Sequence, residues 1–329
     1  MISRGDRRGF AFSFPWLFAI IVGAAIIFLA IYGSTKILRT GEFEQNTETA
    51  KKLTTLFEPL SSGTADGSSG RIKLTSPVRI YEDCFTDGNF GRQRFSTSEE
   101  TTFSEGDFSN AGVGISVSNK YVFAQTPIEG KEFYYFTKKF SMPYDVADIL
   151  MISSEEYCFV KPPTFVKEDI ENLKLDEITL TESINECAQK NPRLSKENIV
   201  CFGNLGSECS IKVTDTSIQR DYTTGYIERE GTTDKNYYIQ NLIYAAIIAD
   251  NQNYECNTKR LSMRTSTLTA VYTEKSKLLS LRGICNSGLD SGLLRLNAYI
   301  TQYYRSSASL AGMQAIAKTI NQGGVCELW

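Results

Sequence analysis

An apolar run from Phe10 to Gly33 constrains this chain more than any other feature of its sequence. About 20 apolar residues cross the hydrocarbon core of a bilayer. A secretory signal has a shorter apolar region of about 7–15 residues, followed by a small-x-small cleavage site. Here Tyr32 stands where a small residue would be needed. The run predicts a retained transmembrane helix over residues 10–33. A buried core helix is the alternative, and the lack of a polar face disfavours it.

The charges on the two sides of this helix predict its orientation. Three arginines precede it, whereas the two basic residues that follow it are mixed with glutamates. Because Lys and Arg accumulate on the cytoplasmic side, residues 1–9 are expected in the cytoplasm and the rest of the chain outside the cell membrane. The arginines that set this topology are Arg4, Arg7 and Arg8, and the residues expected to hold the helix in the bilayer are Trp16, Ile20, Ile26, Phe28 and Tyr32.

The cysteines support the same placement, because all eight follow the apolar run and their number is even. This pattern fits an exported domain with disulfides. A zinc site is the alternative, but the chain has no histidine and no Cys-x-x-Cys pair. Free thiols are a further alternative. The candidates are Cys84, Cys158, Cys187, Cys201, Cys209, Cys256, Cys285 and Cys326.

Two disulfide pairings are predicted. Residues 197–213 read as a hairpin, two apolar runs around a glycine-containing loop, which would place Cys201 opposite Cys209. Antiparallel packing of the C-terminal helices would bring Cys256 to Cys326, unless the last helix breaks sharply at Ser306. The other four cysteines have no partner that the sequence assigns.

The remaining chain divides by its hydrophobic period. Residues 34–60 predict a stalk helix, because six residues recur on one helical stripe. Residues 61–71 are a Gly- and Ser-rich linker. Residues 72–230 predict a β-rich domain and residues 234–329 an antiparallel helical bundle, so the fold class is α+β. The stalk stripe is Phe43, Asn46, Ala50, Leu53, Phe57 and Leu60, which would form a short coiled coil or pack on the chain's own domain.

Three helical segments are expected in the C-terminal part. Residues 236–250 predict a buried helix. Residues 255–283 predict an amphipathic helix that Gly283 ends. Residues 289–324 predict one kinked helix or two collinear ones. The expected inner faces are Leu261, Leu268, Val271, Tyr272, Leu278 and Leu279 for the second segment, and Leu293, Leu296, Ile300, Tyr303, Leu310, Met313, Ile316 and Ile320 for the third.

The residue types restrict the chemistry. The absence of histidine excludes Ser-His-Asp and Cys-His catalysis. A net charge of −3 argues against nucleic-acid binding. Paired carboxylates such as Glu82-Asp83 are interpreted as solvated loop ends, and the basic residues of the 255–283 helix, Arg260 among them, as a solvated face. No catalytic residue, metal site or cofactor is predicted.

The segment from Arg7 to Gly33 resembles the N-terminus of archaeal type IV pilin-like proteins, which carry a basic residue and glycine before a cleavage point. The resemblance implies processing between Gly9 and Phe10. Pilins carry Glu five residues into the mature chain, where this chain has Phe14. The stretches "IEGKEFYYFTKKFSMPYDVADIL", "YCFV" and "LIYAAIIADNQNYECNTKRL" resemble uncharacterised archaeal single-pass membrane proteins.

These observations predict a non-enzymatic, membrane-anchored extracytoplasmic protein with a binding or envelope-assembly role. A pilin-like filament or secretion-system subunit is one alternative, and an envelope hydrolase that uses carboxylates is another. The expected partners are the lipid bilayer and an envelope or filament protein, without nucleic acid. The sequence leaves the oligomeric state open.

Overall fold

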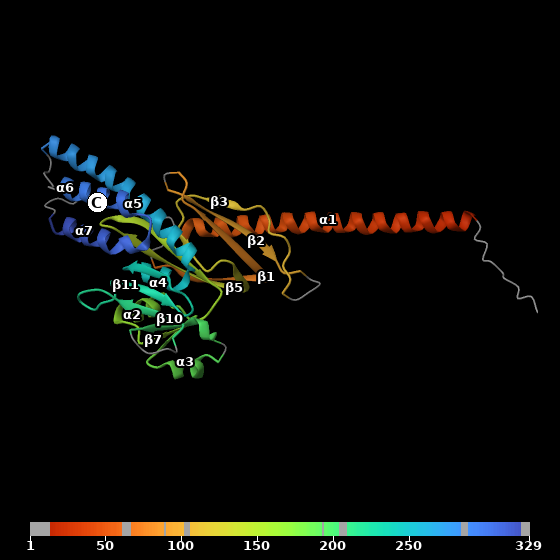
Figure 1. Cartoon of the computed structure of the whole chain (residues 1–329), viewed down its shortest axis with the longest axis horizontal. Coiled ribbons are helices and arrows are strands. Elements are labelled where there is room, and N and C mark those ends of the chain that lie inside the picture. Colours follow the sequence, from red (N-terminus) through yellow and green to blue (C-terminus); the bar gives the residue numbers. More distant parts are fainter. Residues whose placement is uncertain are drawn as a thin grey trace, which may run out of the picture.

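A computed structural model describes residues 14–60, 67–88, 90–101, 106–192, 194–203, 209–283 and 289–323. Its first element is a single helix, α1 (Phe14–Leu60), of 47 residues, which at 1.5 Å per residue is about 70 Å long. The apolar part, Phe14–Ser34, has a mean hydropathy of 2.6 and none of it is buried. Figure 1 shows this part projecting from the body of the molecule, while the other end of α1 lies along the first sheet.

The first sheet has six strands in the described part of the chain, in the order β3-β2-β1-β5-β6-β4. Its neighbours are antiparallel except for β4 and β6. This sheet forms the first half of the β-rich segment predicted for residues 72–230. The strands are β1 (Ser69–Phe85), β2 (Arg92–Glu99), β3 (Ile115–Val117), β4 (Val122–Phe123), β5 (Ile128–Ser141) and β6 (Asp145–Ser153).

The second sheet also has six strands among the described residues, in the order β12-β11-β10-β9-β7-β8. Strands β8, β7, β9 and β10 run parallel to one another. Strand β11 pairs antiparallel with both of its neighbours, β10 and β12. The hairpin predicted for residues 197–213 is therefore wrong, because β9 and β10 run in the same direction. The strands are β7 (Tyr157–Val160), β8 (Ile178–Thr181), β9 (Ile199–Phe202), β10 (Ile211–Asp215), β11 (Thr224–Arg229) and β12 (Lys235–Ile239).

Short helices form two of the connections between the parallel strands, as is usual for parallel pairing. Helix α2 (Thr164–Leu173) joins β7 to β8, and α3 (Ile184–Lys190) with the 3₁₀ turn η1 (Lys196–Asn198) joins β8 to β9. Ser183 occupies the N-cap position of α3, although its side chain bonds Glu186 rather than a backbone amide.

Alternating side chains of the strands build separate cores on the two faces of each sheet. In the first sheet, Phe133 packs in the cluster that includes Leu53 of α1, whereas Phe136 packs in the main core of the molecule. In the second sheet, Phe159 faces the main core and Cys158 faces a smaller cluster. The main core thus lies between the two sheets and the C-terminal helices.

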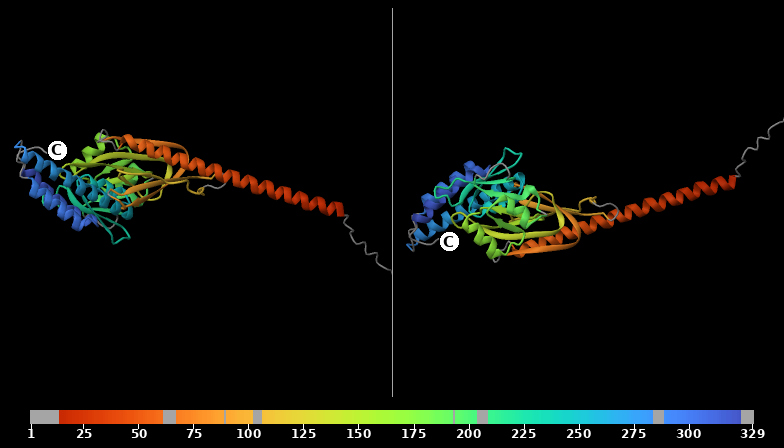
Figure 2. Two further views of the ribbon diagram at one scale, coloured as in Figure 1. Left: turned by 90° about the horizontal axis from the view of Figure 1, so that it is seen from above. Right: turned by 90° about the horizontal axis from the view of Figure 1, so that it is seen from below.

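The C-terminal part is helical after β12. Residues 236–239, predicted as helix, are strand, and the buried helix begins only at α4 (Leu242–Ile248). Then follow α5 (Asn251–Leu281), α6 (Asp290–Tyr303), the turn η2 (Ser307–Ser309) and α7 (Leu310–Gly323). The views in Figure 2 place these helices at the end of the body opposite to the free end of α1. One core cluster joins them to both sheets, so the packing does not separate residues 72–230 from 234–329.

The inner face of α5 differs from the prediction. Val271 and Leu278 are 58% and 56% exposed, so their placement inside is wrong. Leu261 is buried, but most of the buried residues of α5 are Asn, Ser and Thr. Hydroxyls such as Thr265 Oγ1 and Thr269 Oγ1 donate to the carbonyl four residues earlier, at 2.8 and 2.7 Å. Because these bonds satisfy the hydroxyls within the helix, small polar residues can share this face with the apolar ones. Leu268, Tyr272 and Leu279 are partly buried against the main core, as predicted.

The last helical segment is two helices, since α6 and α7 are separated by Tyr304 to Ser309. Gly283 follows the end of α5 with a φ of 64°, in agreement with its predicted role as the stop. Among the residues predicted on the inner faces of α6 and α7, the prediction is wrong for Tyr303, which is 47% exposed. The others are buried as predicted: Leu293, Leu296, Ile300, Leu310, Met313, Ile316 and Ile320.

Candidate functional site

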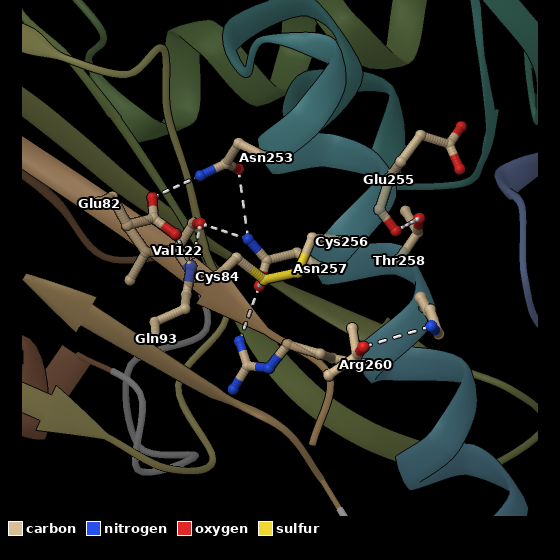
Figure 3. The surroundings of a disulfide bond; sticks show 12 residues. Glu82, Cys84, Gln93, Val122, Asn253, Glu255, Cys256, Asn257, Thr258 and Arg260 are labelled. Atoms are coloured by element: carbon tan, nitrogen blue, oxygen red, sulfur yellow. Dashed lines mark hydrogen bonds between the residues drawn. A yellow bond between two sulfur atoms is a disulfide. The ribbon is translucent and has the colours of Figure 1, made fainter.

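The first turns of α5 lie against the end of β1, where a disulfide joins Cys84 to Cys256 (Figure 3). Asp250 positions this end of the helix. Its carboxylate accepts from the backbone N–H of Asn253 at 2.8 Å, which caps α5, and from that of Thr126 at 2.9 Å, which ties the helix to the chain before β5. The cap therefore fixes both the start of α5 and its position against the sheet.

Glu82 is the buried acid of this site, with 7% of its surface exposed. Gln93 Nε2 on β2 donates to one carboxyl oxygen and Asn253 Nδ2 on α5 donates to the other. These bonds favour the charged form, but burial outweighs them and raises the pKa of Glu82 to about 8. Figure 3 shows Glu82 between the two amides.

The polar contacts continue along one side of α5 to a buried arginine. Asn257 Nδ2 donates to Val122 O at 2.9 Å, and Asn257 Oδ1 accepts from Arg260 Nη1 at 2.7 Å. Arg260 also donates to the backbone carbonyls of Phe90 and Lys120, and it is fully buried. The prediction that Arg260 lies on a solvated face is therefore wrong. Its Nη2 has no hydrogen-bond partner among the described residues.

A pocket of about 420 Å³ opens beside the disulfide. Its walls include both cysteines and three carboxylates, those of Glu82, Asp83 and Asp250. Each carboxylate is engaged: Glu82 by two amides, Asp83 by Arg94 at 2.7 Å, and Asp250 by two backbone N–H groups.

The disulfides agree with the prediction at one pair and correct it at another. Cys201 bonds Cys209 as predicted, although through a loop between parallel strands. Cys256 bonds Cys84 and not Cys326, so that pairing is wrong: the third helical segment breaks after Tyr303, and the first turn of α5 lies on β1. Cys158 bonds Cys187. Cys285 and Cys326 lie outside the described residues.

The predicted anchor residues all lie on the unburied part of α1. Their exposed fractions are 50–68%, for Trp16, Ile20, Ile26, Phe28 and Tyr32. The topology arginines Arg4, Arg7 and Arg8, and the proposed processing point at Gly9 and Phe10, lie outside the described residues.

A second polar contact holds the other half of α1 to the body. Asn46 is 1% exposed; its Nδ2 donates to Ser109 Oγ and Asn110 O, both at 2.9 Å, and its Oδ1 accepts from the Glu99 N–H at 3.0 Å. A Cβ at Gly112 would lie 2.5 Å from the backbone nitrogen of Thr47, so glycine allows this close approach. Ala50 and Leu53 are also buried. Of the other predicted stripe residues, Phe43 is 44% exposed. For Phe57 and Leu60 the structure describes the helical backbone but not the side chains.

Asn46→Ala is expected to loosen this contact. It removes the three hydrogen bonds that Asn46 makes with Ser109 Oγ, the Asn110 carbonyl and the Glu99 N–H, each of which contributes about 0.5–1.5 kcal/mol. Hydrogen exchange should then rise across residues 46–55 of the full chain in detergent. Glu44→Ala, at an exposed position of the same helix, is the control and should leave the exchange unchanged. Equal exchange in both variants would contradict the role of Asn46.

The sequence indicated the cysteines of the site but not its polar partners. Glu82 and Asp83 were interpreted together as solvated, yet only Asp83 is exposed. Neighbouring residues of a strand point to opposite faces, so the alternation of β1 could have separated them. The i, i+4 spacing of Asn253 and Asn257 was a signal too, because it puts both amides on one side of a helix.

The chain matches no protein-family model, no curated protein and no solved structure with which it was compared. No group of three or more His, Cys, Asp or Glu side chains that could hold a metal ion was found within the described ranges.

Proposed function

We propose that the protein is a single-pass membrane protein that holds a disulfide-linked body at a fixed position outside the cytoplasm, for binding or assembly at the envelope. The observation that carries the proposal is the continuity of α1. One helix includes both the unburied apolar segment, Phe14–Ser34, and the segment that Asn46 fastens to the body.

This continuity sets the distance between bilayer and body. The 12 residues from Ser34 to Asn46 correspond to about 18 Å of helix. Because the helix is unbroken over this length, the body cannot swing as it would on a flexible linker. The disulfides among the described residues fit an oxidising compartment.

Membrane extraction tests the anchor. The double variant Ala24→Arg/Ile27→Arg places two charges near the middle of the apolar segment, each at a cost of about 2.5–3.5 kcal/mol on insertion scales. We expect the native chain to remain in the membrane pellet after alkaline carbonate, and the arginine variant to appear in the supernatant. Ala24→Leu/Ile27→Leu is the control. Release of the native chain would contradict the anchor, and protease treatment of intact cells tests the side on which the body lies.

A pilin-like subunit is the second candidate, and the form of α1 favours it. Its apolar half projects from the body unburied and could pack against other copies, while its other half lies on a mainly antiparallel sheet. This candidate predicts a mature N-terminus at Phe10. Mass spectrometry of the purified N-terminal peptide decides between them, because residues 1–9 remain on a simple anchor.

A further inference from the structure

The Cys84–Cys256 disulfide differs from the other two described disulfides in its access to solvent. Both of its cysteines line the pocket of about 420 Å³ and are half-buried. Cys158, Cys187, Cys201 and Cys209 are at most 1% exposed. Thiol–disulfide exchange requires a thiolate to reach one of the sulfur atoms, and the pocket gives that access at one bond among the three.

The position of the bond also differs. Cys158–Cys187 and Cys201–Cys209 connect residues 29 and 8 positions apart, and all four cysteines belong to one cluster on the second sheet. Cys84–Cys256 connects residues 172 positions apart, and it joins the first sheet to α5. Among the described disulfides, it is the one that links the sheet on which α1 lies to the C-terminal helices.

The surroundings can keep the two elements together when this bond is open. Asn253 bonds Glu82 across the same junction, Asn257 bonds Val122 O, and Asp250 holds the start of α5. Asn257 Oδ1 lies 3.8 Å from Cys84 Sγ, so the reduced thiol would find an acceptor without movement of the helix.

From this geometry we propose that Cys84–Cys256 is a thiol-exchange site for a dithiol reductant that enters the pocket, and that the two buried disulfides are structural. A thiolate of the reductant attacks one cysteine sulfur, forms a mixed disulfide and releases the other cysteine as a thiolate, which takes a proton. The second thiol of the reductant then attacks the mixed disulfide, closes the reductant's own disulfide and frees the first cysteine. Two electrons and two protons pass to the protein. The inference does not rest on the proposed membrane anchor.

Reduction of the full chain in detergent by dithiothreitol, without denaturant, tests the proposal. Free thiols are first blocked with unlabelled iodoacetamide, and the cysteines released with time are trapped with a heavy-isotope form and mapped by mass spectrometry. We expect Cys84 and Cys256 to be labelled at least about tenfold faster than the four buried cysteines, because attack depends on access. Equal rates, or earlier release of a buried pair, would overturn the proposal, as would reduction only on global unfolding.

Two variants test whether the pocket is the route. Gln252→Trp adds a bulky side chain at an exposed position of the pocket wall, and Thr267→Trp adds the same group at an exposed position of α5 outside it. We expect Gln252→Trp to slow labelling of Cys84 and Cys256 severalfold and Thr267→Trp to leave it unchanged. Equal rates in both variants would show that the reductant does not enter by the pocket.

Discussion

Replacement of Cys84 and Cys256 by alanine is expected to give the largest loss of stability among the three described disulfides. In the chain-entropy model a crosslink stabilises a protein by restricting its unfolded state, and the effect grows with the length of the closed loop. For the separations of 172, 29 and 8 residues, this model gives about 5, 4 and 2.5 kcal/mol. Urea unfolding of the full chain in detergent, followed by tyrosine and tryptophan fluorescence, measures the differences.

The matched controls are the alanine pairs at Cys158 with Cys187 and at Cys201 with Cys209. All three variants remove one disulfide, so loop length and the local packing distinguish them. A loss at Cys84–Cys256 smaller than at Cys201–Cys209 would contradict the expectation. It would mean that the polar contacts between Glu82 and Asn253, rather than the covalent bond, hold α5 to the first sheet.

Glu82→Gln is expected to remove most of the dependence of stability on pH between about 4.5 and 8. The pKa of Glu82 is about 8 in the folded chain, against an ordinary value of 4.5. The folded state therefore keeps a proton that the unfolded state has lost over this interval, and the free energy of unfolding falls as pH rises from 4.5 to about 8. At about 1.36 kcal/mol per pKa unit, the full effect is at most about 5 kcal/mol.

Thermal unfolding of the full chain across this pH range measures the effect. The melting temperature of the native chain should be highest at the acidic end of the range, and it should fall little further above pH 8. Glu82→Gln should flatten this slope, because glutamine does not ionise. Asp83→Asn changes the exposed neighbour on the same strand and should keep the native slope. An unchanged slope in Glu82→Gln would show that another group titrates.

The elements that the sequence predicted well have a strong local signal. The apolar run has no polar face, and the strands of the first sheet carry β-branched and aromatic residues between turn residues, so hydrophobic period alone indicated them. The stripe of Asn46, Ala50 and Leu53 indicated which side of α1 meets the body. The cysteines indicated disulfides by their number and position.

The errors occur where distant contacts outweigh local pattern. Residues 236–239 have the apolar character of the helix that follows, but pairing with β11 makes them a strand. The inner face of α5 is rich in Ser and Thr, because their hydroxyls bond within the helix, and a count of apolar residues alone wrongly adds Val271 and Leu278 to this face. Cys201 and Cys209 pair although the predicted hairpin is wrong, because a disulfide requires proximity and not a particular strand direction.

The sequence by itself determined the long apolar helix, the even set of cysteines, the order of strand-rich and helix-rich segments, and the exclusion of histidine chemistry. Each follows from residue type or from a period of two or 3.6 residues. Only the tertiary structure decided that Cys84 meets Cys256, that Glu82 is buried between Gln93 and Asn253, and that Arg260 lies inside. These contacts join residues up to 172 positions apart. They exist because the whole fold brings α5 against β1, and no local pattern specifies that approach.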